Sequence, residues 1–369
     1  MIRVLHYVGK MDRGGMETFI MNLYRNINHS EIQFDFAIHG DRNGDFEEEI
    51  LTMGGRFYQF PHMRKNPIAY RKAWRNFWRE HRGEYRAFHM HTNSLANIIA
   101  MEEAYDADVP IRIIHSHSSY ANKGKLQLLN DCIHKLHRKR IGVIATNLIA
   151  CSNKAAEWMF GGMKLGKKNV VLLNNGIDIY KFKYCVEDRK RIREELAISD
   201  DIFLIGQVGA FLPVKNHNFS IDFFKKLKNE NENVKLMLIG EGSLKNDIEH
   251  KVKENGLSED VLFLGKRSDI ECLLSSMDLF IMPSLYEGLP VSLVEAQANG
   301  VPTLASNTIT KEVKFNDNLR YCSIDSGVSK WIEEIPKLGK EHVANIKEIV
   351  QRGFDIKDTC KKYMDILKV

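Results

Sequence analysis

The sequence is poor in residues that cross-link, break or anchor a chain. Its 369 residues include only six cysteines, with no Cys-x-x-Cys pair, which argues against a disulfide framework or zinc site and favours a reducing compartment. Eight prolines and 25 glycines exclude a collagenous or low-complexity chain. The longest apolar run, residues 141–151, falls short of the roughly 18–20 residues that span a bilayer. The polar start, with Arg3 as third residue, does not resemble a signal peptide, so we expect a cytoplasmic protein.

A large charge of one sign is also missing. The chain holds 53 Lys and Arg against 48 Asp and Glu, a net charge of +5 that does not by itself indicate nucleic acid binding. Residues 1–170 hold 25 basic and 17 acidic residues (+8), whereas residues 171–369 hold 28 and 31 (−3). Eleven of the 14 histidines lie in the first part. The two parts therefore face different partners, or one of them faces a negatively charged surface.

The first half of the chain predicts alternating strands and helices. Residues 2–8 form a β-rich run, a loop with Gly14 and Gly15 follows, and Phe19, Ile20 and later residues then repeat at helical spacing. Strand, glycine loop and helix open a doubly wound α/β domain. Further strands are predicted at residues 33–39, 87–91, 111–115, 147–150 and 170–173.

The pattern restarts after residue 178. Strands are predicted at 203–208, 234–239, 261–264, 279–282 and 303–305, with helices at 189–196, 219–229, 244–255, 270–275 and 290–299. We therefore predict an α/β protein with an N-terminal Rossmann-like domain (1–175) and a C-terminal one (176–355) that face each other across a deep cleft. An amphipathic C-terminal helix within 356–369 is expected to pack back on the N-terminal domain. Ligands of such domains bind at the carboxyl ends of the strands.

Residues 283–302, PSLYEGLPVSLVEAQANGVP, carry the strongest chemical signal. Pro290 suits the first turn of a helix and Gly300 its end, so Glu287 precedes the helix and Glu295 lies on it. The start of a helix binds anions, and a carboxylate there makes sense if Glu287 reaches past a phosphate to sugar hydroxyls. Glu295 could accept both hydroxyls of a ribose diol. The alternative is a capping acid and a helix-surface glutamate.

Two glutamates in Glu-Gly-Leu-Pro…Glu-Ala, with seven residues between them, resemble the signature of retaining family 4 glycosyltransferases, which have the two-Rossmann GT-B fold. The resemblance extends over nearly the whole chain and is close to bacterial capsule and exopolysaccharide transferases. It includes Gly14-Gly15-Met16-Glu17 in the first loop, Asn175-Gly176-Ile177-Asp178 at the domain junction, Gly209…Lys215-Asn216 as the donor-phosphate loop, and Gly240-Glu241-Gly242.

The resemblance implies roles for these residues. Lys215 would contact the donor diphosphate and offset its charge, Glu287 would lie at the transferred sugar, and Glu295 would bind the ribose. The remaining donor-binding residues would be Gly15, Gly209, Asn216, Gly240, Gly265, Gly288, Leu289 and Pro290, with backbone N–H groups supplied by Gly288 and Leu289. Without the resemblance, Lys215 would be predicted as a solvated loop lysine and Gly15 as a turn glycine.

One position departs from the family. An arginine usually follows the glycine that Gly209 matches, whereas this chain has Ala210 followed by Phe211. One of two cationic diphosphate contacts is therefore missing. Either Arg13 or Lys266 compensates, or donor affinity is lower, or activity is lost.

Two His-x-His pairs end predicted strands. His89 and His91 share one face of a strand, as do His115 and His117, and such a pair could bind metal. No Cys or carboxylate with matching spacing follows, so we expect no metal site. The resemblance implies that His117 lies near the reacting sugar as a third catalytic residue beside Glu287 and Lys215. His91, together with Glu17, would lie on the acceptor side; the alternative is a strand-end histidine with satisfied hydrogen bonds.

Other ligand motifs are weak or missing. Asp106-Ala107-Asp108 looks like the Asp-x-Asp metal motif of a different transferase fold, but it precedes Pro110 and predicts a solvated turn. No Gly-x-Gly-x-x-Gly or P-loop motif follows a strand, which argues against dinucleotide or P-loop chemistry. The resemblance implies a nucleotide sugar as substrate and no cofactor, and no metal is required because Lys215 and the helix start can hold the diphosphate.

Residues 64–86 carry eight basic and two acidic residues with aromatics interleaved. A basic helix with aromatics is typical of a membrane-surface segment, here assigned to Arg71, Trp74, Arg75, Trp78 and Arg79. The alternative is a domain helix whose aromatics face the core and whose charges face water. Nucleic acid is not expected as a partner, because no recognition module accompanies these charges.

The function implied by the resemblance is retaining transfer of a hexose or N-acetylhexosamine from a nucleotide sugar, in the first place a UDP-sugar. The acceptor would be a lipid-linked oligosaccharide at the inner face of the cell membrane, in capsule or exopolysaccharide biosynthesis. The alternative is a non-catalytic sugar-nucleotide-binding subunit of a polysaccharide assembly complex, to which Ala210 points.

Overall fold

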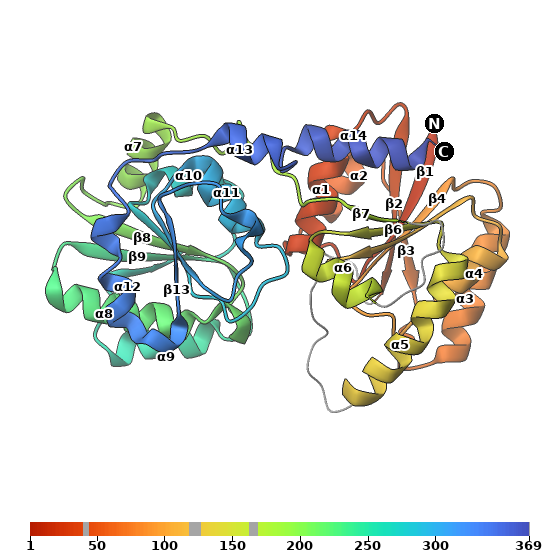
Figure 1. Cartoon of the computed structure of the whole chain (residues 1–369), viewed down its shortest axis with the longest axis horizontal. Coiled ribbons are helices and arrows are strands. Elements are labelled where there is room, and N and C mark those ends of the chain that lie inside the picture. The colour runs from red at the N-terminus through yellow and green to blue at the C-terminus, as the bar shows by residue number, and fades with distance from the viewer. Residues whose placement is uncertain (40–43, 118–126, 162–168, 369) are drawn as a thin grey trace. The chain divides into compact units, whose positions relative to one another are not determined.

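The computed structural model describes residues 1–39, 44–117, 127–161 and 169–368. The chain divides into an N-terminal unit, Met1–Gly176 with Ile356–Val369, and a C-terminal unit, Ile177–Asp355 (Figure 1). The chain passes from the N-terminal unit to the C-terminal unit after Gly176, one residue later than the boundary after residue 175 that the sequence predicted. Where the C-terminal unit begins and ends, Ile177 forms a parallel β-bridge with Asp355.

The N-terminal unit contains a parallel sheet with the order β3-β2-β1-β4-β5-β6-β7 in the described part of the chain. Strand β2 buries every residue except His39, as expected for a strand that helices cover on both faces. The strands are β1 (Ile2–Tyr7), β2 (Ile32–His39), β3 (Phe57–Phe60), β4 (Ala87–Thr92), β5 (Ile111–Ser116), β6 (Asn147–Ala150) and β7 (Val170–Leu172).

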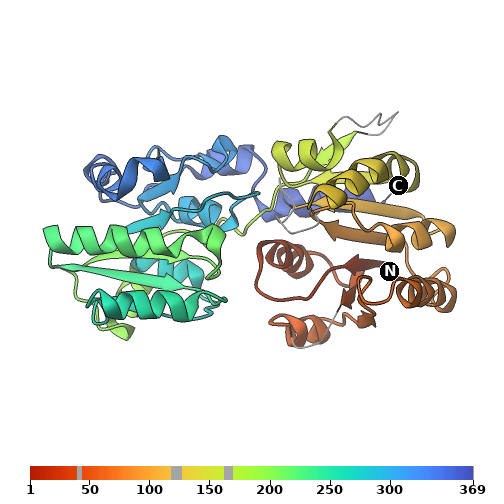
Figure 2. The ribbon, with the colours of Figure 1, turned by 90° about the horizontal axis from the view of Figure 1, so that it is seen from below.

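Helices lie on both sides of this sheet (Figures 1 and 2). The C-terminal helix α14 packs beside α1 in one core, where Tyr363 joins Phe19, Ile20 and Leu23. Its expected return to the N-terminal domain is therefore confirmed. The helices are α1 (Gly15–Asn26), α2 (Glu47–Thr52), α3 (Pro67–Glu80), α4 (Ile99–Asp106), α5 (Gln127–Ile144), α6 (Asn153–Phe160) and α14 (Ile356–Leu367).

The C-terminal unit repeats this design with the parallel order β10-β9-β8-β11-β12-β13. Its core places Phe223 and Phe224 of α8 and Trp331 of α12 against the strands. The strands are β8 (Phe203–Val208), β9 (Val234–Ile239), β10 (Val261–Phe263), β11 (Leu279–Met282), β12 (Thr303–Ser306) and β13 (Leu319–Cys322). The helices are α7 (Val186–Glu195), α8 (His217–Glu230), α9 (Lys245–Glu254), α10 (Ile270–Ser276), α11 (Val291–Asn299), α12 (Gly327–Ile332) and α13 (Ile346–Gln351), with a 3-10 turn at Pro213–Lys215.

The predicted α/β class and two Rossmann-like domains are confirmed, and β8, β9 and β11 have the predicted bounds. Strands β3 and β13 were not predicted. Each has only four residues, of which three in β3 and two in β13 are partly exposed or more, so neither shows the continuous apolar run of a central strand. Among the described residues, no helix is both long and apolar enough to cross a membrane.

Candidate functional site

The candidate donor-binding residues of the C-terminal unit gather at the carboxyl edge of its sheet. Gly209 follows β8 and Gly240 follows β9, while Glu287 lies in the loop after β11. Strands β8 and β11 are neighbours at the point where the strand order reverses. Ligands of doubly wound sheets bind at this switch point, outside the carboxyl ends of the strands.

Lys215 and Glu287 form a direct ion pair. The Lys215 Nζ lies 2.6 Å from Glu287 Oε1, and both side chains are largely buried. Lys215 ends the 3-10 turn, and Asn216 then adopts a left-handed conformation (φ 54°) that opens α8. The backbone N–H of Leu285 donates to the Val214 carbonyl at 2.8 Å, which ties the two loops together. Two residues from separate sequence motifs therefore meet at one point.

The glycines that follow β8, β9 and β10 allow their three loops to approach one another closely. Gly240 has φ +146°, and a Cβ there would overlap the carbonyl oxygen of Gly209, so only glycine fits. Its N–H donates to the carbonyl of Gly265 at 2.9 Å. The side chain of Lys215 lies over Gly209, 3.3 Å from where a Cβ would stand. These contacts position the backbone around the lysine.

Helix α11 begins at the same carboxyl edge of the C-terminal sheet. Pro290 precedes its first turn, which no side chain within the described residues caps, and Gly300 ends the helix in a left-handed conformation. Uncapped N–H groups at a helix start favour an anion. Gly288 is partly exposed in the loop just before this start, whereas Leu289 is buried.

Glu295 lies four residues after α11 begins and is partly buried. Burial raises the pKa of its carboxyl to about 7; Lys181 opposes this rise and Glu271 adds to it. Lys181 itself pairs with Glu271 at 3.1 Å. The carboxyl is therefore ready to accept hydroxyl hydrogen bonds only where the pH keeps it ionised.

Ala210 has only a methyl side chain where the family usually has a guanidinium group. Phe211, which follows it, is buried and stacks on His217 with ring centroids 4.2 Å apart. Of the two compensating cations expected, Lys266 follows Gly265 in this unit. Arg13 belongs to the N-terminal unit, where its guanidinium lies over Phe46.

In the N-terminal unit the glycine loop leads into α1, which begins at Gly15. Glu17 lies in the first turn and is partly buried. Burial raises the pKa of Glu17 to about 7, and Asp12 adds to the rise. The candidate acceptor-side acid is therefore partly protonated near neutral pH.

The predicted acceptor-side histidines belong to a larger cluster. His91 Nδ1 lies 2.8 Å from Nε2 of His117, the residue that follows β5, and His91 Nε2 lies 2.9 Å from His6 Nδ1. His89 and His115 lie beside them. Burial lowers the pKa of His117 to about 3, and those of His91 and His115 well below the usual value. All of these rings are neutral at pH 7.

Sequence reasoning did not include His6 or Tyr363 in a site, and it considered His115 only as part of a possible metal-binding pair with His117. His6 is the single histidine of β1, and Tyr363 is 274 residues away from His89, to which its hydroxyl hydrogen-bonds at 3.0 Å. The neighbouring order of β1, β4 and β5, which brings the histidines together, is a property of the fold rather than of any local pattern.

The membrane assignment of Trp74 and Trp78 is wrong. Trp74 is 0% exposed and Trp78 4%, because both belong to the face of α3 that packs on the sheet. Trp74 stacks on Phe60 at a centroid distance of 3.9 Å. The alternative interpretation, aromatics toward the core and charges toward water, describes α3 correctly.

The arginines of α3 are partly engaged by acids of α4. Arg71 pairs with Glu102 at 2.6 Å and Arg75 with Glu103 at 3.2 Å, whereas Arg79 is exposed and bonds Asn76 of its own helix. On the exposed side of α3, Ile68 is 83% exposed. The Asp106–Asp108 segment ends α4 in a turn, as predicted.

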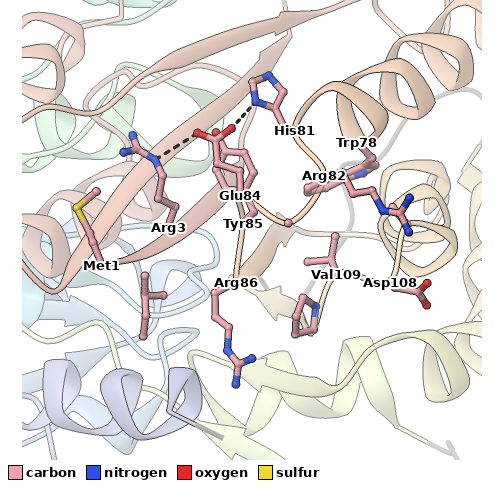
Figure 3. Close-up of a pocket in the computed structure, with 14 residues that line it drawn as sticks. Met1, Arg3, Trp78, His81, Arg82, Glu84, Tyr85, Arg86, Asp108 and Val109 are labelled. Carbon is pink, nitrogen blue, oxygen red and sulfur yellow. Dashed lines mark hydrogen bonds and ion pairs between the residues drawn. The ribbon is translucent and has the colours of Figure 1, made fainter.

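A pocket of about 370 Å³ opens at the opposite edge of the N-terminal sheet (Figure 3). It is lined by residues at the amino ends of strands, among them Arg3 of β1, Arg86 before β4 and Pro110 before β5. Glu84 pairs there with Arg3 and with His81. Because doubly wound sheets bind ligands at carboxyl ends, this pocket is not the candidate donor or acceptor site.

Two family models match the chain in tandem. The model described as "Glycosyltransferase Family 4" matches residues 13–181, and the one described as "Glycosyl transferases group 1" matches residues 188–335. The two matches nearly coincide with the two structural units.

Relatives that match three quarters of the chain or more carry related names. The protein EpsF of Bacillus subtilis is 36% identical over 100% of this chain and 96% of its own length. "Capsular polysaccharide biosynthesis glycosyltransferase CapH" of Staphylococcus aureus is 24% identical over 99% and 96%. "UDP-Gal:alpha-D-GlcNAc-diphosphoundecaprenol alpha-1,3-galactosyltransferase" of Escherichia coli is 24% identical over 77% and 75%.

A solved structure shares the fold. HepE of Anabaena, crystallised in complex with UDP-glucose, superposes with a TM-score of 0.78, at 18% identity and over 100% of this chain and 99% of that one. At this identity the similarity bears on architecture, and the predicted GT-B fold is confirmed.

Proposed function

Because this chain belongs to the family 4 glycosyltransferases, we propose that it is a retaining hexosyl- or N-acetylhexosaminyltransferase of capsule or exopolysaccharide assembly. The donor is a nucleotide sugar with UDP as the carrier, and the acceptor is a lipid-linked oligosaccharide. UDP is supported by the E. coli relative's name and by the UDP-glucose complex of HepE. The lipid is supported by the diphosphoundecaprenol in that relative's name, and the assembly pathway by CapH.

The assignment of the donor site depends mainly on one observation, the ion pair between Lys215 and Glu287. In the free protein each group neutralises the other at 2.6 Å. A donor diphosphate offers Lys215 a better partner, and the released Glu287 then accepts hydroxyls of the transferred sugar. The lysine and the uncapped start of α11 hold the diphosphate without a divalent ion.

Catalysis in this proposal depends on charge and position. The leaving diphosphate assists the incoming hydroxyl on the same face of the sugar, so no residue of the chain is assigned as a covalent nucleophile. Lys215 and the N–H groups of Gly288 and Leu289 stabilise the departing charge. Glu295 orients the ribose. Glu17, His91 and His117 are assigned to the acceptor side.

The test is slow UDP release from the correct donor in the absence of acceptor. A thermal-shift screen of nucleotide sugars first identifies the donor, since a bound ligand raises apparent stability. Glu287→Gln keeps the size of the side chain and removes its charge, and it should abolish UDP release while nucleotide binding persists. Glu333→Gln, at an exposed surface pair with Lys330, is the matched control and should not change turnover.

Normal turnover by Glu287→Gln would rule out the assigned role. Ala210 supports a second candidate, a non-catalytic sugar-nucleotide-binding subunit, because it removes a cation that the family usually has. Tight nucleotide binding by the unmodified chain, with no UDP release from any donor and with or without acceptor, would establish that alternative instead.

We also propose that the N-terminal unit contacts an anionic inner membrane surface. The exposed side of α3 carries Ile68, Lys72 and Arg79, and α5 of the same unit exposes Leu136 and Val143. Apolar side chains among basic ones suit an anionic interface, where each Lys or Arg contributes about 1 kcal/mol. The buried tryptophans have no part in this surface.

A further inference from the structure

Five histidines occupy one face of the N-terminal sheet. His6 of β1 is in register with His89 of β4, and His91, two residues further on, is in register with His115 of β5. His117 follows β5 on the same face as His115. Four of these side chains are almost completely buried, and His117 is partly exposed at the carboxyl edge.

The rings form two hydrogen-bonded rows. In one row, His6 Nδ1 meets His91 Nε2 at 2.9 Å, and His91 Nδ1 meets His117 Nε2 at 2.8 Å. In the other row, the Tyr363 hydroxyl meets His89 Nδ1 at 3.0 Å, and His89 Nε2 meets His115 Nδ1 at 3.3 Å. A neutral imidazole donates through one nitrogen and accepts through the other, so a row of these rings ends in an N–H group on one side and in a lone pair on the other.

The structure contains these unsatisfied nitrogens. Nε2 of His6, Nε2 of His115 and Nδ1 of His117 are buried and have no hydrogen-bond partner among the described residues. Buried polar atoms without a partner are rare in folded proteins and destabilise them. Two of the three belong to the adjacent rings of His115 and His117, whose centroids are 3.9 Å apart, and a ligand that accepts nitrogen lone pairs would pair them.

We propose that His91, His115 and His117 bind one transition-metal ion of the zinc class. One ring nitrogen from each of the three lies within 4.8 Å of one from each of the others. Tetrahedral zinc with nitrogens at about 2.0–2.1 Å brings ligand nitrogens to about 3.3 Å from one another, which small rotations of these rings would reach. Three imidazoles leave a fourth position for water or an anionic oxygen.

The hydrogen-bond rows favour this set over the inner one, His6, His89 and His91, which also has nitrogens within 4.8 Å. If His91 binds through Nδ1, its Nε2–H donates to His6. If His115 binds through its unpartnered Nε2, its Nδ1–H donates to His89, whose Nδ1–H donates to Tyr363 in turn. Each inner ring then fixes the tautomer of an outer one, as the second sphere of a histidine site does.

Metal binding by His6, His89 and His91 would break the hydrogen bonds that fix the ring tautomers. His89 would have to give up either Tyr363 or His115 as a partner, because each of its two ring nitrogens already has one. The outer set also has the more accessible residue, since His117 is partly exposed. The site departs from the expectation of no metal, which considered one strand at a time. The residues of the site belong to the N-terminal unit, whereas Lys215 and Glu287 belong to the C-terminal unit.

The experiment uses the full chain without a polyhistidine tag, grown with added zinc. Elemental analysis should find about one zinc per chain after gel filtration. Removal by a chelator and titration with Co²⁺ should then give the visible absorption of four-coordinate cobalt at one equivalent. This readout does not depend on transferase activity.

Matched variants identify the ligands. His115→Gln and His117→Gln should each lower Co²⁺ affinity at least 100-fold, while His6→Gln, in the second sphere, should lower it about 10- to 100-fold. His250→Gln, at an exposed histidine of α9, should leave affinity unchanged. His117 is partly exposed, so its variant should fold even if His115→Gln does not, and circular dichroism checks both.

Two results would overturn the proposal. Absence of retained zinc together with absence of cobalt absorption would identify the cluster as a metal-free hydrogen-bonded network. Absorption that survives both His115→Gln and His117→Gln but is lost in His6→Gln would assign the ion to the inner set.

Discussion

The two units of this chain have the same doubly wound topology but differ in the residues at the carboxyl ends of their strands. Both sheets are parallel and both reverse their order beside the first strand, between β1 and β4 in one and between β8 and β11 in the other. At this point the C-terminal unit has glycines and the Lys215–Glu287 pair, whereas the N-terminal unit has imidazole rings. The same scaffold thus offers a cation and open backbone in one case and neutral nitrogen lone pairs in the other, which suit different ligands.

Judged by net charge alone, the anionic donor would be assigned to the N-terminal unit rather than to the C-terminal unit. Residues 1–170 carry +8 and residues 171–369 carry −3, yet the proposed anionic donor binds in the second part. The basic residues of the N-terminal unit are spread over helix surfaces such as α3, where acids of α4 engage several of them. A single lysine at a strand end can therefore outweigh a larger surplus elsewhere, because burial and helix dipoles strengthen its contacts.

The largest expected effect comes from removing the cation of the C-terminal unit. Lys215→Ala should lower the rate of UDP release about 10²–10³-fold, the range found when one preorganised donor to a developing oxyanion is lost. The measurement is single-turnover UDP release at saturating donor, which separates chemistry from binding.

Lys330→Ala serves as the control for this variant. Lys330 also pairs with a glutamate, Glu333 at 2.8 Å, but on an exposed helix face. Its loss should leave the rate within twofold, since exposed pairs contribute little. Equal rates for both variants would mean that Lys215 is a structural lysine and that the contrast between the two sheet edges has no catalytic meaning.

A second prediction concerns the glycines that define the C-terminal edge. Gly240→Ala should lower the free energy of unfolding of this unit by about 3 kcal/mol, because the added Cβ meets the Gly209 carbonyl at a backbone angle that alanine disfavours. Urea denaturation measures the loss.

Gly256→Ala separates the two causes. Gly256 also has a positive φ, +68°, but nothing lies within 4 Å of an added Cβ, so only backbone strain of about 1 kcal/mol is expected. Equal losses in the two variants would show that the close approach of the glycine loops is unimportant. Hydrogen exchange in β1, β4 and β5 should stay unchanged in both.

The sequence predicted the C-terminal edge better than the N-terminal one for a physical reason. Lys215, Glu287 and Glu295 belong to local motifs whose spacing carries information, although their contact at 2.6 Å depends on two loops meeting in space. The histidine cluster depends on strand order, which no local pattern of β1 contains. Trp74 and Trp78 were misassigned because composition shows that a helix has a basic and an aromatic face but not which face the sheet covers.

A third prediction compares a titrating acid of the donor site with its neutral replacement. With a pKa of about 7, Glu295 is mostly ionised at pH 8 and mostly protonated at pH 6. If the carboxylate accepts the ribose hydroxyls, UDP affinity should fall up to about tenfold between pH 8 and pH 6. In Glu295→Gln the remaining pH dependence should be that of UDP itself, and calorimetry measures both profiles.

The Glu295→Gln variant should lose UDP affinity at pH 8 but gain thermal stability at that pH. The folded pKa of about 7 lies above the value of about 4.3 for an unfolded chain, so the folded state holds the proton longer. Rising pH therefore destabilises the free protein between about pH 4.3 and pH 7 through this group. Glu295→Gln should melt higher than the parent at pH 8 and show no such gain at pH 4. A gain at both values, or at neither, would contradict the burial of this charge.

The smallest expected effect tests whether membrane contact is a property of the N-terminal unit alone. Lys72 of α3 and Lys253 of α9 are both exposed on helices, one in each unit. Lys72→Glu should weaken co-sedimentation with phosphatidylglycerol-containing vesicles about fivefold or more, from about 1 kcal/mol per basic residue near an anionic surface, and Lys253→Glu should not change it. Binding by the parent chain should decline with salt and be lost on pure phosphatidylcholine. If both variants bind as the parent does, the exposed side of α3 is an ordinary solvated helix face, and the charge difference between the two halves has no membrane role.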